Sequence, residues 1–274
     1  MDSSRPLADA PDRSYASKLD RFARFAAPEI QRILADFAPA PGAVALDLGC
    51  GTGLATGWLS RCIEPGGFVI GLDLSWPHLR AAHAHGTQAL VQADAGQLCF
   101  RDASLDFIWS CNTINHLADP VEALRNLRAS LRDGGRVVLA QSGFLPEMFF
   151  AWDAHLDEVV RRACHAFYRA RYALKVSDTA GIRGLVNLLD QAGFRRGRVR
   201  TYVLERVQPL APADRDYFET AIFAETWGER IQPYLLPDEW AALRRYTDRY
   251  SKDYCLDRSD FHHLQTLTVC EGCA

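Results

Sequence analysis

The sequence predicts an α/β fold in which a doubly wound, mostly parallel sheet of seven strands has helices on both faces and carries helical cap insertions. Three observations support this prediction. Short apolar runs alternate with helical patterns between residues 43 and 142, a glycine-rich loop follows the first run, and an aspartate ends each of the first three runs. Strands that alternate with helices need crossover connections, and right-handed crossovers make the strands parallel.

The elements are expected in a regular order. Residues 15–37 predict two helices that separate near Pro28, because proline interrupts a helix. Strands are then expected at 43–49, 67–75, 89–94, 105–112 and 134–142, with helices at 53–62, 77–85 and 119–133. The later segments are a helical stretch at 144–175, a helix at 179–194, a strand at 198–207, a proline-divided helical region at about 212–250 and a last strand at 263–272.

The alternation stops twice, and these breaks define the expected domains. We expect a disordered tail (1–13), N-terminal helices with the core (14–142), a helical cap insertion (143–178), a continuation of the core (179–209), a second helical cap insertion (210–260) and a final strand with the C-terminal tail (261–274). Ligands of open α/β sheets bind outside the carboxyl ends of the strands, so we expect both insertions to cover the substrate site. Their many aromatic residues suit an apolar or aromatic pocket, although they could equally form the core of the cap or a homodimer interface.

Composition excludes several classes of protein. The net charge is −3, which gives no general attraction to nucleic acid or to an anionic membrane. We find neither the apolar core of a signal peptide nor an apolar window long enough to span a membrane, and we expect a cytoplasmic protein. The eight cysteines are expected to be reduced. The "CEGC" motif at 270–273 has no second ligand pair, so we expect no metal and two frayed terminal thiols.

The loop "LDLGCGTG" at 46–53 distinguishes two kinds of ligand. A dinucleotide-binding loop rests a pyrophosphate on the helix N-terminus. Here Asp47 stands two positions before the first glycine, and it would repel that pyrophosphate by about 4 kcal/mol at a separation of about 4 Å. A P-loop is excluded because no Gly-Lys-Ser/Thr follows. The loop therefore indicates a ligand with a cationic group near Asp47.

Two further acids extend this site. Asp73 ends the second predicted strand, about 20 residues beyond the loop, where a carboxylate accepts hydrogen bonds from a ribose diol. Asp94 ends the third predicted strand, from which it can reach the exocyclic amine of a base. An ammonium, a ribose and an adenine without a phosphate clamp together describe S-adenosylmethionine.

The segments "LDLGCGTG", "IGLDLS", "ADAGQL" and "DPVEALRNLRASLRDGGRVVL" resemble those of class I S-adenosylmethionine-dependent methyltransferases of the small-molecule type. The resemblance covers about residues 40–142 and implies a Rossmann-like sheet. It implies that the loop lines the methionine end of the cofactor and that residues after the fourth strand lie beside the sulfonium. The cofactor-binding residues expected on this basis are Tyr15, Asp47, Gly49, Cys50, Gly51, Gly53, Asp73, Leu74, Asp94, Ala95, Cys111 and Asn112.

Methyl transfer is an in-line displacement in which the cofactor carries the reactive group and becomes S-adenosylhomocysteine. A hydroxyl acceptor also needs a general base. His116, in the loop after the fourth strand, is the candidate base, with a structural role as the alternative. The expected acceptor pocket consists of Asn115, Phe149, Trp152 and His155.

Two alternatives to a small-molecule methyltransferase stay open at this point. The basic runs at 161–175 and 195–200 are compatible with an RNA or protein methyltransferase, although the total charge is negative and no Asn-Pro-Pro-Tyr-like motif follows the fourth strand. A chain of this fold could also bind S-adenosylmethionine without methylating, as a pericyclase or a regulator. The expected partner is a small-molecule acceptor, in preference to nucleic acid or a membrane.

Overall fold

The computed structural model describes residues 13–97, 100–142, 152–172 and 181–274. The predicted N-terminal tail falls outside this range except for Arg13, which begins the first helix. The chain forms two compact units. The sheet unit contains the residues up to Ser142, Gly181–Tyr202 and Leu267–Ala274, and the insertion unit contains Gly143–Ala180 and Val203–Thr266.

The sheet has seven strands in the order β3-β2-β1-β4-β5-β7-β6, which confirms the predicted fold class. The strands are β1 (Val44–Leu48), β2 (Phe68–Asp73), β3 (Leu90–Gln92), β4 (Leu105–Cys111), β5 (Leu131–Ser142), β6 (Arg195–Val207) and β7 (His262–Cys273). The first five strands pair in parallel, whereas β7 runs antiparallel to β5.

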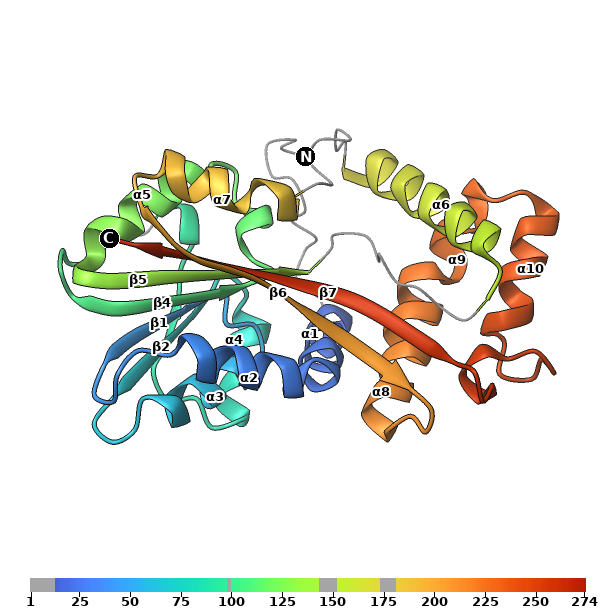
Figure 1. Ribbon diagram of the computed structural model, residues 1–274, viewed down its shortest axis with the longest axis horizontal. Coiled ribbons are helices and arrows are strands. Elements are labelled where there is room, and N and C mark those ends of the chain that lie inside the picture. The colour runs from blue at the N-terminus through green and yellow to red at the C-terminus, as the bar shows by residue number, and fades with distance from the viewer. Residues whose placement is uncertain (1–12, 98–99, 143–151, 173–180) are drawn as a thin grey trace. The chain divides into compact units, whose positions relative to one another are not determined.

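Helices cover both faces of this sheet (Figure 1). The helices of the sheet unit are α1 (Arg13–Phe25), α2 (Ala27–Phe37), α3 (Leu54–Cys62), α4 (Trp76–Ala84), α5 (Pro120–Ser130) and α7 (Gly181–Gln191). In Figure 1, α5 and α7 lie on one side of the sheet, and α2 and α3 lie on the other. Leu46, Ile108 and Val137 are fully buried between these layers, because a covered parallel sheet is apolar on both faces.

The insertion unit is helical apart from the strand segments that enter it. Its helices are α6 (Ala154–Tyr172), α8 (Pro212–Asp216), the π-helix η4 (Tyr217–Trp227), α9 (Gly228–Ile231), the 3-10 helices η5 (Gln232–Tyr234) and η6 (Cys255–Asp257), and α10 (Pro237–Thr247). The ring of Trp152 lies 5.7 Å from that of Trp227 and 5.8 Å from that of Tyr246, between centroids. Phe218 and Trp227 are buried. Many of the aromatic residues therefore form the core of this unit.

None of the helices in the part of the chain that the structure covers has both the length and the apolar character of a membrane span.

The C-terminal cysteines correct one prediction. Cys270 is only 1% exposed, and burial raises its pKa to about 11. It lies in β7, which is inserted between β5 and β6 and pairs with β5 as far as Cys273. The expectation of two frayed thiols was wrong, because β7 pairs on both sides within the sheet and buries Cys270. Both cysteines are free, and the described residues contain no cluster of three or more candidate metal ligands.

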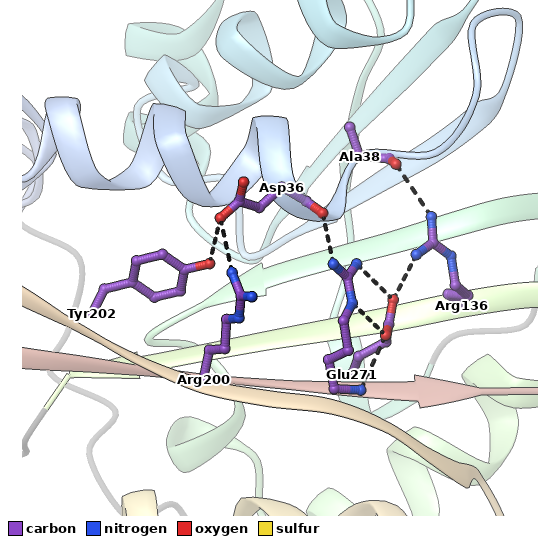
Figure 2. Close-up of polar contacts among 7 residues, drawn as sticks. Asp36, Ala38, Arg136, Arg200, Tyr202 and Glu271 are labelled. Carbon is purple, nitrogen blue, oxygen red and sulfur yellow. Dashed lines mark hydrogen bonds and ion pairs between the residues drawn. The ribbon is translucent and has the colours of Figure 1, made fainter.

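An ion-pair network around the buried carboxylate of Glu271 ties β7 to the end of α2 (Figure 2). The carboxylate of Glu271 accepts hydrogen bonds from Arg136 Nη1 at 2.6 Å and from Arg198 Nε at 3.2 Å. The same two guanidinium groups donate to the carbonyl oxygens of Ala38, at 3.2 Å, and Asp36, at 3.0 Å. The network therefore satisfies C-terminal carbonyl groups that no helix partner can reach.

Candidate functional site

Three aspartates stand together at the carboxyl edge of the sheet. Asp47 is the penultimate residue of β1, Asp73 ends β2, and Asp94 comes two residues after β3. These strands are neighbours in the sheet, with Asp47 opposite Gly71 and Asp73 opposite Gln92. The parallel register therefore places the three acids along one edge, as the sequence pattern predicts.

The glycine loop folds back against the end of β2. The amides of Gly49 and Cys50 donate to the carbonyl oxygen of Leu72 at 2.7 and 2.8 Å. The amide of Gly51 donates to Asp73 Oδ2 at 2.9 Å, so the loop and the second acid form one unit. Gly49 has a φ of +73°, and a Cβ there would lie 2.1 Å from Thr113 Oγ1, so no larger residue fits.

Asp47 is a buried acid, only 2% exposed. Its Oδ2 accepts a hydrogen bond of 2.6 Å from Thr56 Oγ1. Burial raises the pKa of Asp47 to about 7, the Thr56 hydrogen bond opposes this rise, and the nearby charge of Asp73 adds to it. Such an environment favours either a protonated carboxyl group or a cation placed beside the carboxylate.

The thiols of this site are not activated. Burial raises the pKa of Cys111 to about 12, and the negative charge of Asp47 adds to the rise. Burial also raises the pKa of Cys50 well above its ordinary range. Both side chains therefore stay protonated at neutral pH, and neither is a nucleophile.

Asp73 is held by three donors. Its Oδ1 accepts from the amide of Ser75 at 2.8 Å and lies 3.2 Å from Nδ1 of His78, while its Oδ2 accepts from Gly51. Next to it, the side chain of Leu74 is half exposed and offers an apolar surface. Trp76, the first residue of α4, is 58% exposed.

Asp94 begins a short turn beside β3. Its Oδ1 accepts from the amide of Gly96 at 2.9 Å, and its carbonyl oxygen accepts from Gln97 at 3.0 Å. Ala95 follows it as the first residue of the 3-10 helix η1 (Ala95–Gln97) and is buried. Asp94 thus caps a turn, and this contact is compatible with a second role toward a ligand.

The segment after β4 adopts a constrained conformation. Asn112 has a φ of +55°, and its Oδ1 accepts from the amide and the hydroxyl of Ser142 at 2.8 and 3.0 Å. This contact fastens the end of β4 to the end of β5. Asn115 and His116 lie in the following 3-10 helix η2 (Ile114–His116), where His116 is half-buried.

The remaining predicted site residues belong to the insertion unit or lie outside the described residues. Phe149 lies outside the described residues, as does the side chain of Tyr15, whose backbone is in α1. Trp152 and His155 belong to the insertion unit. There Trp152 donates its indole hydrogen to Asp157 at 2.6 Å, and the side chain of His155 is exposed. Their assignment to an acceptor pocket stays a prediction.

Sequence reasoning missed several residues that shape the site. Thr56, Thr113 and His78 contact or flank the acids and glycines, but they belong to no motif. The only local signal is the order Asp-Leu-Ser-Trp-Pro at 73–77, in which Ser75 caps α4 by accepting from the amide of His78. The turn that this cap imposes brings the imidazole of His78 back to Asp73.

Comparison with known proteins also indicates a methyltransferase domain. Residues 46–139 match a family model described as "Methyltransferase domain". A malonyl-[acyl-carrier protein] O-methyltransferase of Marinomonas sp. (strain MWYL1) is 36% identical over 54% of this chain and 56% of that protein. A demethylmenaquinone methyltransferase of Staphylococcus aureus (strain JH9) is 28% identical over 63% of this chain and 76% of that protein. The chain spans about half the length of several curated relatives, between 43% and 56%.

A solved structure extends the likeness to the fold. A putative type II methyltransferase from Anaeromyxobacter dehalogenans has a TM-score of 0.59 at 21% identity, covering 90% of this chain and 94% of that one. The site also fits the ligand that this family uses. It offers a buried acid whose raised pKa suits a cationic neighbour, a held carboxylate and an exposed apolar leucine. Residues 46–139 therefore match the methyltransferase domain family, and the sheet around them has the fold of a solved methyltransferase.

Proposed function

We propose that this chain transfers the methyl group of S-adenosylmethionine to a small apolar or aromatic acceptor and releases S-adenosylhomocysteine. The observation that carries this proposal is the alignment of Asp47, Asp73 and Asp94 at the carboxyl ends of three neighbouring strands, beside a glycine loop. S-Adenosylmethionine supplies both the electrophilic methyl carbon and the leaving group. The protein then has to bind and orient the cofactor and the acceptor and exclude water. Orientation alone can lower the activation barrier by about 7–11 kcal/mol.

Each part of the edge has a role in this proposal. Asp47 and the loop from Gly49 to Gly53 hold the methionine end of the cofactor, with Asp47 facing the ammonium. Asp73 accepts hydrogen bonds from the ribose hydroxyls, and the exposed Leu74 packs against the adenine. Asp94 and Ala95 lie near the adenine amine. Cys111, a protonated thiol, and Asn112, fastened to Ser142, lie on the sulfonium side.

The acceptor is the finer part of the proposal. Of the relatives named above, one is described as a methyltransferase of malonyl-[acyl-carrier protein] and the other as a methyltransferase of demethylmenaquinone. We favour an aromatic acceptor for this chain because its insertions are rich in aromatic residues. This support comes from the amino-acid composition of the insertions. In the structure, Trp152, Phe218 and Trp227 pack with other aromatic rings of the insertion unit.

Turnover tests the proposal. The purified chain is incubated with S-adenosylmethionine and a panel of quinol, phenol and malonyl-thioester acceptors, and S-adenosylhomocysteine is quantified. We expect acceptor-dependent formation of S-adenosylhomocysteine with at least one aromatic compound. Turnover only with the thioester would overturn the aromatic assignment, and cofactor binding with no turnover would favour a non-methylating protein.

His116 provides a test of general-base catalysis. Replacing His116 with alanine should slow methyl transfer to a hydroxyl acceptor by about a hundredfold, because a positioned base contributes roughly that factor. The affinity for S-adenosylmethionine should not change. His83→Ala, at an exposed position of α4, is the control and should behave like the wild type. An unchanged kcat in His116→Ala would assign this half-buried histidine a structural role.

Asp47 predicts a proton release on cofactor binding. The pKa of Asp47, about 7, lies above the ordinary value of 3.8. The protonated carboxyl group therefore contributes to the free energy of unfolding below pH 3.8, and this contribution is lost as the pH rises through about 7. An ammonium beside the carboxylate lowers that pKa again. At about pH 7, cofactor binding should therefore release a fraction of a proton. Calorimetry in two buffers of different ionisation enthalpy measures this release, and Asp47→Asn should abolish it. Equal proton release by both proteins would contradict the ammonium contact.

A further inference from the structure

A buried histidine stands behind the acid that we assign to the ribose. His78, in the first turn of α4, is 4% exposed, and its Nδ1 lies 3.2 Å from Asp73 Oδ1. Because a carboxylate only accepts hydrogen bonds, Nδ1 carries the hydrogen and donates it. The ring therefore makes a direct contact with Asp73 through its Nδ1–H group.

Packing alone does not explain a histidine at this position. A leucine or methionine would fill a buried position of this size without burying polar nitrogens, and burying a polar group costs free energy that a hydrogen bond has to offset. Ser75 caps the same helix turn through a hydrogen bond of 3.4 Å to the amide of His78, so the cap does not need the imidazole. The contribution specific to histidine is the N–H that it directs at Asp73.

The hydrogen bonds around Asp73 show what this N–H does. Oδ1 accepts from Ser75 and His78, and Oδ2 accepts from Gly51. A carboxylate has about four acceptor positions, so these three donors leave about one, on Oδ2. Without His78 two backbone amides would still hold the carboxylate, that of Ser75 on Oδ1 and that of Gly51 on Oδ2. Rotation about χ2, a broad torsion in aspartate, would then be less restricted.

We propose that His78 is a positioning residue that orients the Asp73 carboxylate so that Oδ2 meets a ribose hydroxyl of the cofactor. This inference rests on the proposed function, because it assumes that S-adenosylmethionine binds at this edge. His78 does not touch the cofactor and takes no part in the displacement.

The experiment compares two ligands on three proteins. The ligands are S-adenosylhomocysteine and its analogue that lacks the 2′- and 3′-hydroxyl groups of the ribose. The proteins are the wild type, His78→Met, which fills the space without a donor, and His78→Asn, whose side-chain N–H can replace Nδ1–H. Competition calorimetry gives the dissociation constants, and circular dichroism verifies that each variant is folded. His78→Leu replaces His78→Met if the latter does not fold.

We expect His78→Met to bind S-adenosylhomocysteine about tenfold more weakly, which corresponds to one hydrogen bond to a charged group. The analogue without ribose hydroxyls should bind equally well to all three proteins, and His78→Asn should bind S-adenosylhomocysteine within about threefold of the wild type. Equal weakening of both ligands would show a purely structural role, and no weakening of either would show no role, so both overturn the inference while leaving the proposed function intact. Failure of the wild type to bind S-adenosylhomocysteine would instead refute the proposed function.

Discussion

Replacing Asp73 with alanine is expected to remove measurable binding of S-adenosylmethionine in titration calorimetry. In the proposed site this carboxylate binds the ribose hydroxyls, and each hydrogen bond to a charged group contributes about 1.5–3 kcal/mol. The substitution also removes the acceptor of the Gly51 amide, which lies 2.9 Å from Asp73 Oδ2. The loop would therefore lose its anchor to β2 at the same time as the ligand loses its partner. We expect an affinity loss of at least about a hundredfold.

A matched control separates this effect from a general loss of acid. Asp133→Ala removes an exposed aspartate in the first part of β5, in the same unit but on a different strand. It should bind the cofactor like the wild type. Unchanged affinity in a folded Asp73→Ala protein would refute the assignment of Asp73 to the ribose.

Replacing Glu271 with glutamine is expected to lower the free energy of unfolding by about 1–2 kcal/mol. The buried carboxylate would lose its charge-assisted hydrogen bonds, while the partly exposed Arg136 and Arg198 remain screened by solvent. Burial raises the pKa of Glu271, but hydrogen bonds from Arg198 and Arg136 outweigh this effect and hold the pKa below its ordinary value. The charged form is thus stabilised by the fold. Its contribution is present above the ordinary carboxyl pKa of 4.5 and is lost as the pH falls through the lowered value.

Urea unfolding at neutral and at acidic pH measures this contribution. The difference between the wild type and Glu271→Gln should shrink as the pH falls. Glu122→Gln, which breaks an exposed ion pair between Glu122 and Arg125 in α5, should change the free energy of unfolding by less than about 0.5 kcal/mol. If Glu271→Gln were as mild as this control, the network of Figure 2 would not stabilise the attachment of β7 to α2.

Local patterns were sufficient to predict the sheet and the edge that carries the acids. Each strand up to β5 was recognisable as an apolar run, and parallel strands bring their carboxyl ends to one side. For this reason Asp47 and Asp73 could be placed together although 26 positions separate them in the sequence. The start of α5 is also determined locally, since Asp119, which precedes Pro120, caps this helix by accepting a hydrogen bond from the amide of Glu122.

Features that depend on long-range pairing could not be predicted in this way. Glu271 meets Arg136 across 135 positions only because β7 is inserted antiparallel beside β5. The same insertion buries Cys270, which was expected to be frayed because it lies near the end of the chain. His78 reaches Asp73 through a turn whose geometry no motif specifies. The aromatic content of the insertions could not distinguish a pocket lining from a core, because both need the same residues.

The most direct test of the central claim is a crystal structure of the chain with S-adenosylhomocysteine. The account predicts density at the carboxyl edge of β1 and β2, with the ribose hydroxyls on Asp73, the ammonium beside Asp47 and the adenine between Leu74 and Asp94. Density for the ligand at another place, or a ribose that does not contact Asp73, would contradict it.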